Sequence, residues 1–288
     1  MQNQSFSDTA RRGFNSLPAA IRVIISINVV IFLIQLVSYA IGSTALNSFF
    51  TGWLAYTSNV LHTVTHPWTL VTYTFLHADF WHILVNMLML WWLGSPVEER
   101  LGPRTFCAIY FGAGIGGALI NLFFATLFGW TTSVIGASGA VFGIMVALTM
   151  LYPRMPIYLF FMIRVELRYA VAGFVLLNLL WVGSNDGTAY IVHLGGAASG
   201  YLLMKAWRKG LDLSHPIYTI ERWWYKLKGG HKKQTASNSN MYSVSDVEVV
   251  EEDRQSELDD ILEKISEDGY DALTKAEKKK LFELSKNK

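Results

Sequence analysis

Apolar residues form long blocks along this chain, and short polar segments separate them. The first block extends from about Ala19 to Ala40, and Asn28 and Gln35 are its main polar interruptions. A helix needs about 20 consecutive apolar residues to cross a bilayer. The block therefore predicts a first membrane-spanning helix.

Five further apolar blocks follow, and each predicts one more helix. They extend from about Phe80 to Leu93, Thr105 to Phe128, Ser138 to Leu151, Tyr169 to Val182 and Thr188 to Trp207. The pattern as a whole predicts an all-α polytopic membrane protein, in which six transmembrane helices form a bundle.

The segments between these blocks differ in character. Residues 41–76 are rich in aromatic side chains and contain no Lys or Arg. Because Trp and Tyr favour the membrane interface, we expect this segment to lie in the outer leaflet. Residues 97–104 are expected to form a charged turn. Residues 152–168 are basic around an apolar middle, so their relation to the membrane is left open.

Composition narrows the class of protein. The 288 residues are 52% hydrophobic and only 16% charged, with a mean hydropathy of +0.30, which argues against an ordinary soluble domain. A formal net charge of +2 gives no reason to expect nucleic acid as a partner. The single cysteine, Cys107, excludes an internal disulfide and is expected to be a small buried hydrophobe.

The distribution of basic residues predicts the orientation in the membrane. Lys and Arg are absent from 41–76, 129–137 and 183–188, but they occur in 100–104 and 154–168. Cytoplasmic loops carry the excess of Lys and Arg. We therefore expect both termini to be cytoplasmic and the fourth and sixth helices to begin on the outer side.

Four regions follow from these patterns. We expect a cytoplasmic N-terminal segment at 1–18 and a membrane core at 19–208. A linker rich in Lys, Gly, Ser and Asn would occupy 209–257, and a small soluble, cytoplasmic helical hairpin would occupy 258–288.

Ser138 is the candidate for chemistry, because it lies among small residues at the start of the fourth block. Polar groups at membrane depth are costly and often functional. Two interpretations stay open at this point. Gly139 and Gly143, four residues apart, are typical of a helix-packing face, whereas Ser138 is a candidate nucleophile if a base lies nearby.

His193 is the candidate base, since it begins the sixth block at a depth similar to that of Ser138. Gly196 and Gly200 keep one face of its helix flat, which would let the two helices approach closely. His82 and Asn86, four residues apart on one helix face, could stabilise an oxyanion or could simply bond to neighbouring helices.

A metal site is the other use for outer-side histidines. His62, His66, His77 and His82 all lie in segments expected on that side. No HExxH motif and no pairing with carboxylates accompanies them. We therefore expect neither a metal nor another cofactor.

Four motifs, taken together, resemble the rhomboid family of intramembrane serine proteases over residues 15–208. They are Gly136-Ala137-Ser138-Gly139 (GxSG), His77, His82 and Asn86 (HxxxxHxxxN), Glu98 and Gly102 (ExxxG), and His193 followed by Gly196 and Gly200. Each motif is weak by itself, but all four occur in the family's order.

The resemblance implies a rhomboid-like bundle and a catalytic Ser138–His193 dyad without an acid. It further implies that Asn86, His82 and the backbone N–H of Ser138 hold the oxyanion, and that His77 helps to order the first loop. Phe142 falls where the family places an aromatic residue against the histidine. Gly136, Gly139 and Gly196 would support the site.

The chain departs from the family pattern at three positions. Phe142 replaces a frequent Tyr, which removes any role for that hydroxyl. Thr69 follows Trp68 where the family often has Arg, which puts the anchoring of the first loop in doubt. Val192 replaces the Ala that usually precedes the histidine.

The resemblance implies a serine endopeptidase that cuts single-pass transmembrane proteins near the outer membrane face. Its partners would be those substrates and the lipid bilayer, and we expect a bacterial inner membrane. A non-catalytic protein that binds or escorts transmembrane helices is the alternative. A small-solute transporter is disfavoured, since the chain shows no internal repeat.

Overall fold

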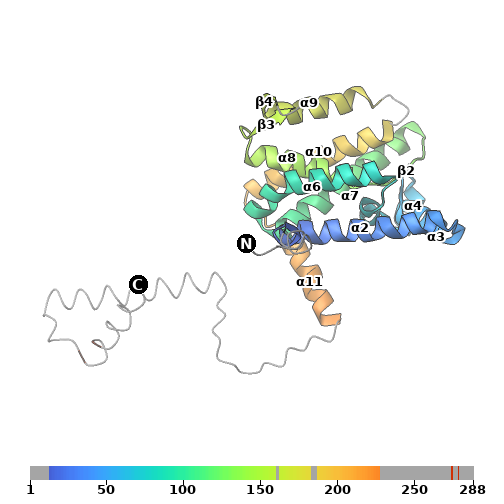
Figure 1. Ribbon diagram of the computed structural model, residues 1–288, viewed down its shortest axis with the longest axis horizontal. Helices are drawn as coiled ribbons and strands as arrows, with labels where there is room; N and C mark the ends of the chain where they lie inside the picture. The colour runs from blue at the N-terminus through green and yellow to red at the C-terminus, as the bar shows by residue number, and fades with distance from the viewer. Residues whose placement is uncertain (1–12, 160–161, 183–186, 228–273, 275–277, 279–288) are drawn as a thin grey trace, which may run out of the picture. The chain divides into compact units, whose positions relative to one another are not determined.

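The computed structural model describes residues 13–159, 162–182, 187–227, 274 and 278, and helices dominate them (Figure 1). The principal helices are α2 (Ala19–Ala40), α6 (Phe80–Leu101), α7 (Pro103–Phe128), α8 (Ser138–Leu151), α9 (Leu167–Leu180), α10 (Gly187–Arg208) and α11 (His215–Leu227). The chain divides into two compact units, 1–229 and 230–288. The second unit, with the hairpin predicted at 258–288, lies almost entirely outside the described residues.

Three helices are long and apolar enough to cross a membrane within the described part of the chain. They are α2, α6 and α7. Helices α8 and α9 are also apolar, but each has 14 residues, which is shorter than the roughly 20 that a straight span requires. The six predicted membrane crossings therefore stay a prediction.

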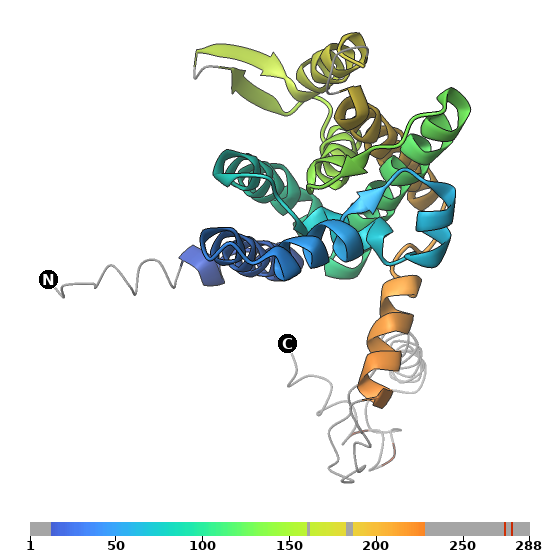
Figure 2. The same ribbon diagram turned by 90° about the vertical axis from the view of Figure 1, so that its right-hand side faces the viewer.

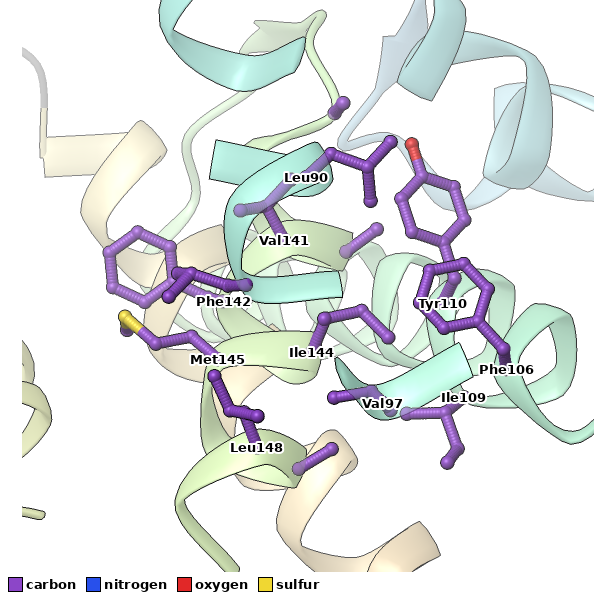
Figure 3. Close-up of a cluster of buried hydrophobic side chains, with 14 of the residues drawn as sticks. Leu90, Val97, Phe106, Ile109, Tyr110, Val141, Phe142, Ile144, Met145 and Leu148 are labelled. Carbon is purple, nitrogen blue, oxygen red and sulfur yellow. The ribbon is translucent and has the colours of Figure 1, made fainter. Parts of the chain in front are cut away.

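Helix α10 packs against both α7 and α8 and forms the centre of the bundle with them. Figure 2 shows several of these helices nearly end-on, with α9 and the adjacent hairpin at one edge. A core of buried side chains joins α6, α7 and α8 (Figure 3). It includes Leu90, Val97, Phe106, Ile109, Tyr110, Ile144 and Leu148.

Glycines set the distance between α8 and α10. A Cβ at Gly196 would collide with the backbone carbonyl of Gly139, and a Cβ at Gly200 would lie 2.6 Å from the Cα of Gly143. Only hydrogen atoms fit between the two backbones at these points. The flat faces that the sequence predicted are therefore the surfaces through which the two helices meet.

The aromatic segment 41–76 folds into short elements that pack on α7. They are α3 (Thr44–Phe49), the π-helix η1 (Phe50–Leu54), β1 (Tyr56–Thr57), α4 (Val60–Thr65), α5 (Thr69–Thr72) and the 3₁₀ helix η2 (Tyr73–Phe75). The Tyr56 hydroxyl donates to the carbonyl of Ala118 (2.9 Å), and the Tyr73 hydroxyl donates to that of Gly114 (2.8 Å). These buried bonds fix the segment to α7.

The anchoring of this segment does not need an arginine after Trp68. The indole N–H of Trp68 donates to the carbonyl of Trp53 (2.7 Å), and the two indoles stack with centroids 5.9 Å apart. The buried hydroxyl of Thr69 donates to the carbonyl of His66 (2.7 Å). Trp68 and Thr69 thus hold the loop by local bonds.

The prediction of a charged turn at 97–104 is wrong. Helix α6 continues through Pro96 to Leu101, and the break falls only at Gly102, whose φ is +79°. The buried carboxylate of Glu98 explains the continuation. It accepts hydrogen bonds from the backbone N–H groups of Ala20 (2.7 Å) and Ile21 (2.9 Å) in the first turn of α2. The residue before α2, Pro18, offers no capping side chain, so Glu98 caps this helix from α6.

Two short β-pairs correct the all-α prediction. Strand β2 (Ser133–Val134) pairs antiparallel with β1, so the aromatic segment joins the loop before Ser138. Strands β3 (Pro156–Leu159) and β4 (Ile163–Glu166) form an antiparallel hairpin between α8 and α9. Residues 156–159 and 163–166 of the segment 152–168 are therefore extended.

The linker expected at 209–257 is corrected in its first part, where residues 215–227 form helix α11. Arg104 on α7 forms an ion pair with Glu221 of α11, with 2.9 Å between Nε and Oε2. Only Glu221, Arg222 and Lys226 are charged among the 13 residues of α11, and its apolar residues recur with helical spacing. This amphipathic pattern is the sequence signal that could have predicted the helix.

Candidate active site

Ser138 is the first residue of α8, directly after a strained turn. Gly136 has a φ of +121°, which residues with a side chain rarely adopt, and its N–H donates to the carbonyl of Tyr73 (2.9 Å). The turn thus depends on both a glycine and the aromatic segment. It leaves the N–H groups of the first turn of α8 without intrahelical partners.

Ser138 and His193 are hydrogen-bonded across two helices. The Oγ of Ser138 lies 2.7 Å from Nε2 of His193, although 55 positions separate the residues in sequence. Both side chains are half-buried. The close approach of α8 and α10 through Gly139 and Gly196 makes this distance attainable.

Three further side chains contact the His193 ring. Phe142, one turn after Ser138, stacks on it with centroids 4.5 Å apart and planes inclined by 7°. Tyr190 contacts it edge-on at 6.2 Å. Its Nδ1 lies 2.8 Å from Oδ1 of Asn178 on α9.

Asn178 was not predicted from the sequence. The residue is a lone amide in an otherwise apolar block, and only 6% of it is exposed. A polar residue in such a position is the same signal that drew attention to Ser138.

A cavity of about 660 Å³ contains the pair, and its walls are mostly apolar. Helices α6, α8, α9 and α10 all contribute to it. The polar side chains that line it are Ser138, His193, His82, Asn86, Asn178 and Tyr190. The predicted nucleophile, base and oxyanion residues therefore share one cavity. The N-terminal end of α8 also faces this region, and its dipole favours negative charge.

The tautomer of His82 follows from its contacts. Its Nδ1 accepts a hydrogen bond from the backbone N–H of Ala78 (3.3 Å). The proton of the neutral ring is then on Nε2, which would be only 2.6 Å from a Cβ at Gly136. His82 thus directs an N–H group at the turn before Ser138, and a side chain at Gly136 would block it.

Asn86 lies one turn further along α6. Its Nδ2 donates to the carbonyl of His82 (2.8 Å), which fixes the orientation of the amide. An amide nitrogen carries two protons, so one remains for the cavity. Asn86 is buried, with 6% of its surface exposed.

His77 lies beside this group but lines a different cavity. Its ring contacts that of His82 at 4.9 Å, and its backbone N–H donates to Oε1 of Gln35 (3.2 Å). Burial, and to a lesser extent the neighbouring His82, lower the pKa of His77 from its ordinary 6.5 to about 4. The cavity that it lines has a volume of about 490 Å³ and lies against α2.

The candidate metal residues do not form a ligand set in the part of the chain that the structure describes. His62 and His66 stack with centroids 4.6 Å apart. His77 and His82 contact each other in a separate place. Over the described ranges, no three His, Cys, Asp or Glu side chains gather closely enough to hold an ion.

The model of the Rhomboid domain matches residues 64–209, which include every residue of the site described above. The chain belongs to the rhomboid family. Membership makes it a membrane protein, in agreement with its three long apolar helices.

Curated rhomboid relatives match about half of this chain. Rhomboid protein 1, mitochondrial, of Saccharomyces cerevisiae is 34% identical over 147 residues, covering 48% of this chain and 41% of that protein. RHOMBOID-like protein 12, mitochondrial, of Arabidopsis thaliana is 32% identical over 160 residues (49% and 47%). Rhomboid protease GluP of Bacillus subtilis is 31% identical over 139 residues (48% and 26%).

This rhomboid spans less than half the length of these relatives. Two of them are mitochondrial, so they lend no support to the expectation of a bacterial inner membrane. Residues 250–287 match the model of a second family, DUF6576, whose function is unknown.

Proposed function

We propose that this rhomboid is an intramembrane serine endopeptidase in which Ser138 is the nucleophile and His193 the general base. The observation that carries the proposal is the 2.7 Å contact between Ser138 Oγ and His193 Nε2 inside an apolar cavity. As Oγ attacks a peptide carbonyl carbon, its proton passes to Nε2. His193 then delivers that proton to the leaving amine nitrogen, and an acyl-enzyme remains until water attacks it.

Three donors would stabilise the tetrahedral intermediate. They are the Nε2–H of His82, the free amide proton of Asn86 and the backbone N–H of Ser138. The first two are supported by hydrogen bonds that fix each group's orientation. Donors that are already oriented stabilise developing charge without reorganisation, and removing one typically costs 10²–10³ in kcat.

The other predicted residues would support the site without touching the substrate carbonyl. Gly136 leaves space for His82, and Gly139 and Gly196 bring α8 and α10 together. Phe142 fixes the plane of the His193 ring. His77 packs behind His82.

The substrate would be a transmembrane segment of a single-pass protein, cut near the outer face of the bilayer. The mostly apolar lining of the cavity supports an apolar peptide, and its polar groups gather around Ser138. The distribution of Lys and Arg supports cytoplasmic termini and six crossings of the membrane.

The test is cleavage by the purified full chain in proteoliposomes. A transmembrane peptide with small, helix-breaking residues near one end would be incubated with wild type, Ser138→Ala, His193→Ala and the control Ser95→Ala. Ser95 lies on α6, and its hydroxyl donates to the carbonyl of Trp91 outside the cavity. We expect cleavage by wild type and the control, and a loss of at least about 10³-fold in the other two.

A fluorophosphonate probe separates a poor substrate from an inactive protein. Labelling of Ser138 in wild type, with none in Ser138→Ala, would support the proposal even if the chosen peptide is not cut. If the folded wild type is neither labelled nor active, the proposal fails. A protein that binds transmembrane helices without cutting them would then be the better interpretation.

A further inference from the structure

The contact between Asn178 and His193 suggests a role for α9 in the chemistry. Asn178 Oδ1 lies 2.8 Å from His193 Nδ1, the ring nitrogen on the far side from Ser138. The two residues are 15 positions apart and come from different helices. The chain Ser138–His193–Asn178 therefore joins α8, α10 and α9 through one imidazole.

The amide of Asn178 has only one consistent orientation. Its Nδ2 donates to the carbonyl of Phe174, one turn earlier on α9, at 2.8 Å. The oxygen must then face His193. An amide oxygen only accepts hydrogen bonds, so Nδ1 of His193 has to be the donor.

That assignment fixes the tautomer of His193. A neutral imidazole carries one proton, and with the proton on Nδ1 the lone pair is on Nε2. Nε2 is the atom that faces Ser138 Oγ. Asn178 thus selects the form of His193 that can accept the serine proton. The opposite tautomer would have no lone pair on Nε2.

The surroundings of Asn178 argue for more than a bond between helices. The other buried residues of α9 are Leu167 and Val171, which are both apolar. Asn178 is the single buried polar side chain among the described residues of that helix, and it lines the cavity beside His193. An amide used only for packing would not need to meet the candidate base.

We propose that Asn178 is a positioning residue that holds His193 in the Nδ1–H tautomer and so prepares Nε2 as the base. This inference rests on the proposed function. It adds a third, uncharged member on α9 to the dyad. Triads with an amide as third member occur in cysteine proteases, so the chemistry is sound.

The first experiment compares Asn178→Leu, Asn178→Asp and the control Val171→Ala in the full chain. Leu keeps the branched shape but removes the acceptor, whereas Asp restores an acceptor at the same place. Val171→Ala loosens α9 without changing a polar contact. For each variant we would measure kcat and KM, and the pH profile of fluorophosphonate labelling.

We expect Asn178→Leu to lower kcat by roughly 10- to 100-fold with little change in KM, since a positioned base contributes about 10²–10⁴. Asn178→Asp should recover most of kcat. Its carboxylate would also favour the imidazolium, so the low-pH limb of its profile should move to higher pH. Val171→Ala should stay within about twofold of wild type.

A second measurement reads the tautomer without relying on catalysis. Nitrogen-15 NMR of histidine-labelled protein distinguishes Nδ1–H from Nε2–H, and His193→Gln identifies the signal. We expect Nδ1–H in wild type and a mixture in Asn178→Leu. An Nε2–H signal in wild type, or unchanged kcat and pH profile in Asn178→Leu, would overturn the inference. Inactivity of wild type itself would refute the proposed function, and the NMR result would still decide the tautomer.

Discussion

The His193 ring lies flat against the phenyl ring of Phe142, with 4.5 Å between the centroids and 7° between the planes. Phe142 has no polar side-chain atom, so it does not orient the imidazole by charge. It restricts the rotation of the imidazole ring by contact. The ring must lie in that plane for its two nitrogens to reach Ser138 and Asn178 at once.

Replacing Phe142 should therefore weaken catalysis moderately. Such an aromatic contact contributes about 1 kcal/mol, so Phe142→Leu should lower kcat by about fivefold. Phe142→Tyr keeps the ring and should stay near wild type. Phe124→Leu is the control and should stay near wild type, because Phe124 stacks on Phe128 (6.2 Å) on α7 and does not line the cavity. A kcat for Phe142→Leu equal to that of wild type would contradict the role of the stack.

The approach of α8 to α10 gives a second prediction. A Cβ at Gly196 meets backbone atoms of Gly139, which cannot move aside as a flexible side chain could. We expect Gly196→Ala to destabilise the protein by at least about 1–3 kcal/mol and to abolish labelling of Ser138. Thermal unfolding in detergent would measure the loss.

Gly173→Ala is the matched control for that substitution. Gly173 lies in α9, and nothing is within 4 Å of a Cβ placed there. Alanine favours helices over glycine by up to about 1 kcal/mol, so the control should be neutral or stabilising. Equal losses in the two variants would mean that the helix contact is looser than the geometry requires.

The carboxylate of Glu98 gives a third prediction, which concerns stability alone. It accepts the N–H groups of Ala20 and Ile21 at the start of α2 and is only 4% exposed. Glu98→Ala would leave both donors buried, at a cost of about 1–3 kcal/mol for each unsatisfied group. The midpoint of thermal unfolding should fall accordingly.

The neighbouring Glu99 is exposed and provides the control. Glu99→Ala should change the unfolding free energy by less than about 0.5 kcal/mol. If the two alanine variants unfold at the same temperature, Glu98 does not cap α2 in solution.

The lowered pKa of the buried His77 predicts how the stability of the folded protein depends on pH. Its pKa in the folded protein is about 4, below the 6.5 of an unfolded chain. Between these values the unfolded chain binds the extra proton, so stability falls as the pH drops from 6.5 toward 4. The slope from one proton is at most about 1.4 kcal/mol per pH unit.

Unfolding experiments between pH 7 and pH 4 would measure this dependence. His77→Asn removes the titrating group and should flatten the curve over that range. The nearby ring of His82 also titrates and Asp79 opposes the shift, so a residual slope is expected. A slope as steep in His77→Asn as in wild type would exclude His77 as its source.

The sequence predicted the positions of the apolar helices well because their apolar blocks are long. The first helix, Ala19–Ala40, has the predicted bounds, and α7, α8, α9 and α10 begin within two residues of the predicted starts. The end of α6 was missed for a physical reason. Its last turn is charged, yet Glu98 is buried against the start of α2, a contact that no local pattern reveals.

The site was predicted in part. Ser138, His193, His82 and Asn86 line one cavity, because their motifs lie in helices that meet. Asn178 was not predicted. A lone asparagine in an apolar helix carries no motif, and only the packing of α9 brings it to the imidazole.

Helix α9 buries three side chains against the rest of the protein, Leu167, Val171 and Asn178. The last of these is also the acceptor for His193. A displacement of this end of α9 would therefore withdraw the acceptor from His193. The position of one helix and the placement of a proton on its neighbour are thus coupled through a single amide.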